Sequence, residues 1–140
     1  MSKSAVVFWS GTGNTEAMAE AVIEGLTAAG AEVSTIAPAD FTADDVAQFD
    51  AIAFGCPAMG AEVLEETEFD PMFTSIEGAL NGKKIGLFGS YGWGDGEWMR
   101  AWESRCVSDG AVIPASFVIC QDAPDAEALE ALKALGQALA

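Results

Sequence analysis

Trp9-Ser10-Gly11-Thr12-Gly13-Asn14-Thr15 joins an apolar run at residues 5–8 to a helix-like pattern at residues 16–26. This order predicts a strand, a tight loop (residues 9–15, the first loop) and a helix N-terminus. Two glycines let the backbone close around a ligand. The amides of a first helical turn point outward without partners and carry partial positive charge. The loop also carries four short polar side chains, those of Ser10, Thr12, Asn14 and Thr15. Together these features are typical of a phosphate site.

The surrounding charge indicates which phosphate would fit. No Lys or Arg occurs between Ser4 and Gly82, whereas the same stretch holds 14 acidic residues. The loop also lacks the Gly-Lys-Ser/Thr ending of a nucleoside-triphosphate loop. Amides and hydroxyls without a cation favour a phosphate monoester, such as that of a mononucleotide cofactor. The alternative is an ordinary strand-to-helix turn rich in small residues.

Composition limits the class of protein. The 140 residues are 51% apolar and 20% charged, so we expect one globular domain over residues 1–140. There is no apolar run long enough for a bilayer and no secretory signal, which predicts a cytoplasmic protein. The net charge of −16 argues against nucleic acid and anionic membranes, and favours a monomer that meets basic patches on protein partners, although solubility alone would also explain it. With no His and three unclustered Cys, we expect no metal site.

Apolar runs alternate with helical patterns along the whole chain. The expected strands are 5–9, 33–36, 51–55, 85–89 and 115–120, and the expected helices are 15–29, 43–48, 69–80, 97–109 and 125–139. Short strands separated by helices indicate βαβ units, and nearly continuous apolar strands indicate a sheet covered on both faces. We therefore expect an α/β doubly wound parallel sheet, whose ligands bind beyond the carboxyl ends of its strands.

Two further loops follow expected strands, at residues 56–62 (the second loop) and 90–96 (the third loop). Trp93 lies between glycines and would stack on a planar ring, or alternatively cover the core as a lid. Met59 is the candidate for the opposite face of the ring. Gly60 allows its peptide to turn, so that it could respond to protonation of a ring nitrogen. Glu62 would accept from a ring N–H or be one more surface carboxylate. Trp98 and Trp102, four residues apart, are expected to pack in the core.

These motifs together resemble the flavodoxins, specifically the short-chain kind of anaerobic bacteria. The similarity runs along essentially the whole chain and is strongest at residues 9–15, 55–60 and 89–96. It implies a five-stranded parallel sheet of order 2-1-3-4-5 with helices on both faces, holding one non-covalent FMN. The function implied is one-electron transfer between redox enzymes, through the quinone, semiquinone and hydroquinone forms of the flavin, and not enzymatic turnover.

The resemblance also assigns the cofactor-binding residues. The phosphate would be held by Ser10, Gly11, Thr12, Gly13, Asn14 and Thr15. Met59 and Trp93 would sandwich the ring, the Gly60–Ala61 peptide would turn toward its N5–H, and Glu62 would accept from its N3–H. The rest of the site would come from Pro57, Ala58, Ser90, Tyr91, Gly92, Gly94 and Gln121.

Three positions depart from the family pattern. Ala61 stands where relatives often have a polar residue, Pro57 stands where some have serine, and Asp122 is an acid where an amide is common. Two other functions remain open, a flavin-dependent quinone or nitro reductase on the same fold and a non-redox mononucleotide-binding module. The many carboxylates would oppose an anionic reduced flavin, which predicts a low-potential carrier.

Overall fold

The computed structural model describes residues 2–11, 13–59, 63–92 and 94–140. Within these ranges, five parallel strands form one sheet in the order β2-β1-β3-β4-β5, which confirms the expected topology. The strands are β1 (Lys3–Phe8), β2 (Glu32–Ile36), β3 (Ala51–Gly55), β4 (Lys84–Tyr91) and β5 (Val118–Gln121).

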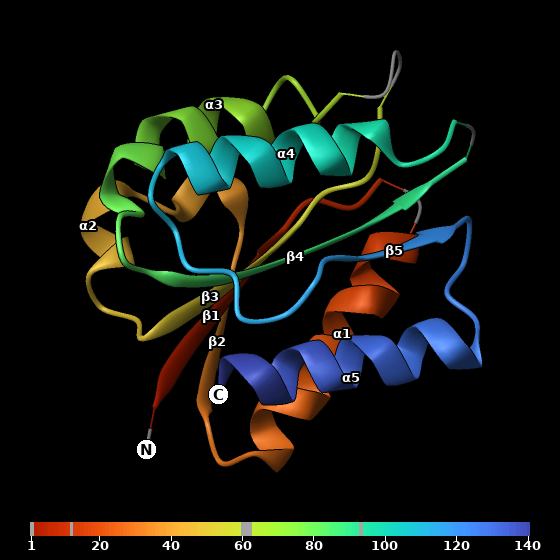
Figure 1. Ribbon diagram of the computed structural model, residues 1–140, viewed down its shortest axis with the longest axis horizontal. Helices are drawn as coiled ribbons and strands as arrows, with labels where there is room; N and C mark the ends of the chain where they lie inside the picture. Colours follow the sequence, from red (N-terminus) through yellow and green to blue (C-terminus); the bar gives the residue numbers. More distant parts are fainter. Residues whose placement is uncertain (1, 12, 60–62, 93) are drawn as a thin grey trace.

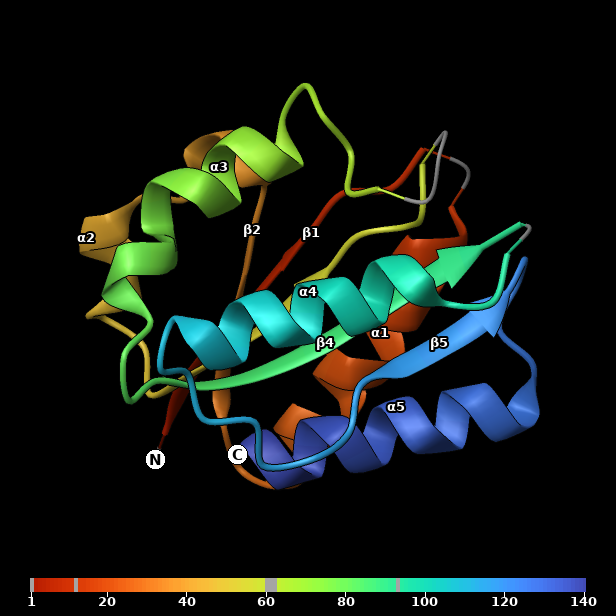
Figure 2. The same ribbon diagram turned by 45° about the horizontal axis from the view of Figure 1, so that its top comes forward.

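Helices cover both faces of this sheet. They are α1 (Asn14–Ala28), α2 (Ala43–Val46), α3 (Phe69–Ile76), α4 (Glu97–Ser108) and α5 (Ala126–Leu139), with short 3-10 turns η1 (Pro38–Asp40) and η2 (Glu77–Ala79). Figures 1 and 2 show α1 and α5 on one side of the sheet and α2, α3 and α4 on the other. The doubly wound arrangement is therefore confirmed.

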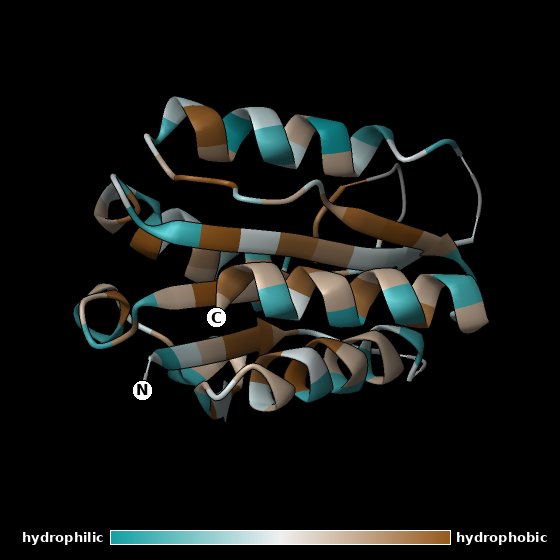
Figure 3. Ribbon diagram, turned by 60° about the horizontal axis from the view of Figure 1, so that its bottom comes forward, coloured by the Kyte–Doolittle hydropathy of each residue, from teal (hydrophilic) through white to brown (hydrophobic). Residues whose placement is uncertain are grey.

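The two faces of the sheet build two cores because side chains alternate along each strand. Val6 and Ala53 pack with α1 and α5. Val7 and Phe54 pack on the opposite face, where Trp102 of α4 is also buried, as the four-residue spacing of the two tryptophans predicted. Figure 3 shows the result, with hydrophobic colouring along the strands and striped helices.

The helices α1 and α5 lie unusually close together. A Cβ atom at Gly25 would collide with the carbonyl oxygen of Lys133, and one at Gly136 would collide with that of Val22. Both positions therefore need glycine because the helix backbones touch there. This close approach fixes α1, and so fixes the N-terminus to which the first loop leads.

Strand ends differ from the sequence-based expectation where pairing decides them. β4 continues through Ser90 and Tyr91, because these residues pair with Cys120 and Gln121 of β5. β5 begins at Val118, later than expected, since its continuous pairing with β4 covers residues 118–121, and Val112 makes a separate bridge to Lys84. α5 starts close to the expected position, and its N-cap is Asp125, which accepts a hydrogen bond from Ala128 N–H at 2.8 Å.

No helix in the described ranges has the length and apolarity that crossing a membrane requires.

Candidate functional site

The carboxyl ends of β1, β3 and β4 surround a cavity of about 230 Å³, which we call the loop pocket. It is lined by Trp9, Gly11, Asn14, Pro57, Ala58, Met59, Ser90, Tyr91, Gly92 and Asp122. Each of the three loops singled out in the sequence contributes to it. The expected convergence of these loops at one edge of the sheet is thus observed.

Ser10 shapes the first loop from within. Its Oγ accepts hydrogen bonds from Gly13 N–H at 3.1 Å and from Glu16 N–H at 3.3 Å. Gly13 is the N-cap of α1, has φ +93° and has no side chain, so the Ser10 hydroxyl supplies the capping oxygen that it lacks. Because Oγ already accepts two bonds, the remaining capacity of this hydroxyl is its own proton, a donor.

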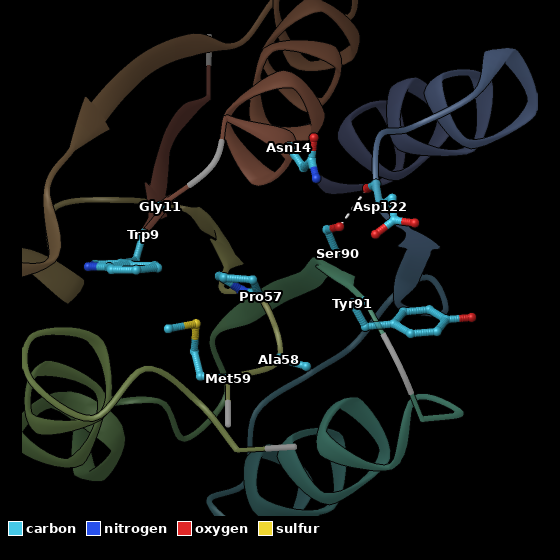
Figure 4. A pocket seen from close by; sticks show the side chains of 10 residues that line it. Trp9, Gly11, Asn14, Pro57, Ala58, Met59, Ser90, Tyr91 and Asp122 are labelled. Carbon is cyan, nitrogen blue, oxygen red and sulfur yellow. Dashed lines mark hydrogen bonds between the residues drawn. The ribbon is translucent and has the colours of Figure 1, made fainter. Parts of the chain in front are cut away.

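Trp9 forms one wall of the pocket. In Figure 4, Trp9 and Met59 lie on one side of the pocket and Tyr91 lies on the other. A Cβ atom at Gly11 would come within 2.9 Å of Trp9 Cη2, so any side chain at position 11 would push the indole from its place. The first glycine of the loop therefore has a packing reason as well as a possible ligand-binding one.

The second loop is held to its neighbours by backbone hydrogen bonds. Ala58 N–H donates to Ser90 O at 3.0 Å. Met59 and Val63 exchange two bonds, Met59 N–H to Val63 O at 2.8 Å and Val63 N–H to Met59 O at 3.0 Å. The pocket-lining residues 57–59 are consequently fixed to β4. They are also fixed to residues 63–65, where the chain returns from the second loop (the returning chain).

Asp122 closes the pocket beyond β5. It is the non-glycine residue of the described chain with positive φ, +57°, a conformation that Asp and Asn tolerate best. Ser90 Oγ donates to its carbonyl oxygen at 2.6 Å, the dashed line in Figure 4, and Asp122 N–H donates to Tyr91 O at 2.8 Å. The backbone bonds hold the residue in place and leave its carboxylate at the rim.

The structure brings together some of the predicted site residues and not others. Eight of them line the loop pocket: Gly11, Asn14, Pro57, Ala58, Met59, Ser90, Tyr91 and Gly92. The remaining described ones, which are not part of that lining, are Ser10, Gly13, Thr15, Gly94 and Gln121. Of these, Thr15 is buried, and Gln121 Nε2 donates to Gly92 O at 3.2 Å, so it supports the third loop. Thr12, Gly60, Ala61, Glu62 and Trp93 lie outside the described residues.

Two lining residues, Trp9 and Asp122, were not among those predicted. Trp9 directly follows an apolar run, so strand periodicity made it part of the strand. The signal that could have assigned it is Gly11, which leaves room for a large ring two residues away. Asp122 was noted in the sequence as a departure from the family pattern, but its place at the rim depends on its left-handed backbone, which sequence does not show.

Among the described residues that line the pocket, Asp122 is the charged one, and a second carboxylate lies buried nearby in the sequence. Glu65, which is 4% exposed, follows the second loop. Burial alone would raise the pKa of its carboxyl, but hydrogen bonds from Thr67, Phe69 and Glu68 outweigh burial and lower it. Among the described residues, no cluster of Cys, Asp or Glu is arranged to hold a metal ion.

Comparison with known proteins identifies the family. The family model described as Flavodoxin matches residues 6–135. The chain belongs to the flavodoxin family. A flavodoxin of Megasphaera elsdenii is 50% identical over 120 residues, which cover 86% of this chain and 87% of that protein. A flavodoxin of Clostridium beijerinckii is 48% identical with the same coverage.

Solved structures of flavodoxins agree with this assignment. The solution structure of two-electron reduced Megasphaera elsdenii flavodoxin matches with a TM-score of 0.88 over 97% of each chain, at 48% identity. A flavodoxin from the domain Archaea matches with a TM-score of 0.85 at 27% identity, over 98% of this chain and 95% of that one. The flavodoxin-like sheet is itself the standard example of ligand binding where strand order reverses, between β1 and β3.

Family membership settles the general function. Flavodoxins are electron-transfer flavoproteins, not enzymes, and FMN is their cofactor, so these expectations are confirmed. An electron carrier exchanges electrons with redox partners. Family membership therefore supports the expectation of redox partners in this general form.

Proposed function

We propose that residues 1–140 form one FMN-binding domain in which the loop pocket holds the flavin ring and the first loop holds the phosphate. The observation that carries this proposal is that the pocket adjoins the N-terminus of α1 at the reversal point between β1 and β3. A ring in the pocket would lie next to amides suited to an anion.

The residues present fit FMN chemically. An oxygen, Ser10 Oγ, already accepts from one first-loop amide, that of Gly13, and from one amide in the first turn of α1, that of Glu16, so this region is folded around an oxygen acceptor. The pocket wall combines an indole, a thioether and a phenol ring from Trp9, Met59 and Tyr91, which suit a planar heterocycle. Bound FMN would supply the redox chemistry, while these residues bind and orient it and exclude water.

In this proposal Met59 contacts the ring, with Pro57, Ala58, Ser90, Tyr91, Gly92 and Gly94 around it and Gln121 supporting the third loop. The predictions for Thr12, for Trp93 as stacking partner, for the Gly60–Ala61 peptide and for Glu62 remain part of the proposal. They rest on the sequence alone.

We further propose a low-potential carrier that acts as a monomer in the cytoplasm and docks on basic patches of reductases and low-potential acceptors. The net charge of −16 supports the monomer, the basic partners and the low potential, whereas the cytoplasmic location rests on the sequence-based expectation. It opposes self-association, attracts basic surfaces and disfavours extra negative charge on a bound flavin.

Titration of the flavin-free protein with FMN tests the proposal. We expect quenching of FMN fluorescence at one FMN per chain, and stepwise reduction that passes through a distinct one-electron spectrum. Electron transfer should need a separate reductase. A protein that leaves FMN fluorescence unchanged would refute FMN binding, and steady oxidation of NADPH by a quinone without a reductase would refute the carrier role.

A further inference from the structure

Cys56 is a buried thiol at the end of β3 that the proposed binding chemistry does not use. It has 0% exposure and directly precedes the pocket-lining residues 57–59. Burial raises the pKa of this thiol to about 12, so it stays protonated at neutral pH. The thiolate is the reactive form of cysteine, and a neutral, enclosed thiol is unreactive. Any role of this sulfur therefore lies in the contacts that it makes.

The sulfur joins two separate stretches of chain. Sγ accepts a hydrogen bond from Glu65 N–H at 3.3 Å and lies 3.6 Å from Pro57 O, toward which the S–H can donate. The backbone of Cys56 is tied elsewhere, since its N–H donates to Phe88 O at 3.1 Å and its carbonyl accepts from Trp98 Nε1 at 3.3 Å. Thus Cys56 is fixed to β4 and α4 while its side chain holds the returning chain at Glu65.

Glu65 in turn fixes the returning chain to α3. Its carboxylate accepts from Thr67 N–H at 2.8 Å, Glu68 N–H at 2.7 Å and Phe69 N–H at 2.9 Å. The N-cap residue of α3, Glu68, makes no capping bond with its own side chain, so Glu65 supplies the helix's acceptor. Residues 56 and 65 therefore form the two fixed ends of the chain that carries the second loop.

We propose that Cys56 is a positioning residue. Its sulfur accepts a hydrogen bond from the Glu65 amide and thereby holds residues 57–59, which form a wall of the pocket, at a fixed distance from α3. The hydrogen-bonded pair Met59–Val63 completes the arrangement, because it joins the pocket wall to the returning chain at a second point, nearer the pocket. The effect on the flavin rests on the proposed function, whereas the effect on the loop does not.

Amide hydrogen exchange in the flavin-free protein tests the loop directly. The variants are Cys56→Ala and Cys56→Ser, with Cys106→Ala as control, since Cys106 is another fully buried thiol, on α4, that does not line the pocket. We expect the Glu65 and Val63 amides to exchange about tenfold faster in Cys56→Ala, the loss of roughly one hydrogen bond. Cys56→Ser keeps an acceptor and should restore most of the protection. Equal exchange in Cys56→Ala and the control overturns the proposal.

Ligand binding supplies the second readout. Cys56→Ala should weaken FMN and riboflavin by a similar factor of about three to ten, because the wall contacts the ring and not the phosphate. The control should bind both as wild type does. Unchanged affinities in Cys56→Ala also overturn the proposal. If Cys56→Ala does not fold, Cys56→Val, which fills the site without an acceptor, is compared with Cys106→Val. Failure of wild type to bind FMN would refute the proposed function alone, since the exchange result stands without flavin.

Discussion

Replacing Ser10 by alanine separates two roles of its hydroxyl, capping α1 and donating to a bound phosphate. The hydroxyl accepts from Gly13 N–H and Glu16 N–H, at 3.1 Å and 3.3 Å, and thereby caps α1. Losing an N-cap oxygen costs about 0.5–2 kcal/mol, and we expect about 1 kcal/mol here because Ser10 is half-buried. Urea unfolding of the flavin-free protein measures this loss of unfolding free energy.

The effect on binding is predicted separately. If the Ser10 proton donates to a phosphate oxygen, its removal deletes a hydrogen bond to a charged group, worth about 1.5–3 kcal/mol. FMN affinity should then fall at least about tenfold, since each 1.4 kcal/mol is a factor of ten. Riboflavin, which has no phosphate, should keep its affinity within about twofold. Fluorescence titration with both ligands gives the two dissociation constants.

A second serine, Ser4, provides a matched control. Ser4 lies in β1, is 1% exposed, and its Oγ has no hydrogen-bond partner among the described residues. Ser4→Ala therefore removes an unsatisfied polar atom, and we expect unchanged binding and an equal or higher unfolding free energy. Equal weakening of FMN and riboflavin in Ser10→Ala would show that Ser10 acts only by shaping the loop. No weakening of FMN would refute the phosphate assignment.

Three further predictions concern charge. Glu65→Gln should lower the unfolding free energy at pH 7 by about 1–2 kcal/mol. Since hydrogen bonds lower the pKa of Glu65 below its usual 4.5, this stabilisation is present above pH 4.5 and lost as pH falls through the folded-state pKa. Urea unfolding between pH 3 and 7 should show the unfolding free energies of wild type and Glu65→Gln converging as the pH falls. A difference in unfolding free energy that does not change with pH would contradict the argument. Asp109→Asn should do the opposite, because burial and the neighbouring Glu77 raise the pKa of Asp109, so that its charge destabilises the fold above that pKa. We expect a gain of about 0.5–1 kcal/mol at pH 7 that disappears in acid, and a loss at pH 7 would contradict it. Finally, raising salt from 0.02 to 0.3 M (about 20 to 6 Å of screening length) should tighten FMN but not riboflavin, because salt screens repulsion between the phosphate and the net charge of −16. Weakening of FMN by salt would show that an unrecognised cation holds the phosphate.

Much of the architecture could be predicted because it depends on local patterns. The apolar run at residues 51–55 is buried on every residue, as a strand covered on both faces requires. Chain order then places the first, second and third loops at one edge, because all the strands run in parallel. Met59 was chosen from the second loop for its polarizable thioether, and it lines the pocket, while its contact with the ring stays a prediction.

Other features could not be predicted because they depend on contacts between distant residues. Ser90 lies in β4, beyond the expected strand end, only because Cys120 pairs with it. The place of Asp122 depends on its bond from Ser90 and on its left-handed backbone. The acceptor role of Cys56 depends on Glu65, nine residues later, whose amide the fold brings to the sulfur.

Amides and carboxylates act on a phosphate over different distances, and this difference explains how so acidic a chain could bind an anion. Two unit charges 10 Å apart in water interact by about 0.4 kcal/mol, and physiological salt screens them over about 8 Å. A hydrogen bond to a charged oxygen contributes about 1.5–3 kcal/mol and acts at contact, where salt has little effect. Several amides at the start of α1 would therefore outweigh, for a phosphate bound there, the repulsion from carboxylates spread over the surface. Those carboxylates remain available to act at long range on a partner's basic surface. An anion site built on backbone amides, with no Lys or Arg from residue 4 to 82, would keep these two effects independent.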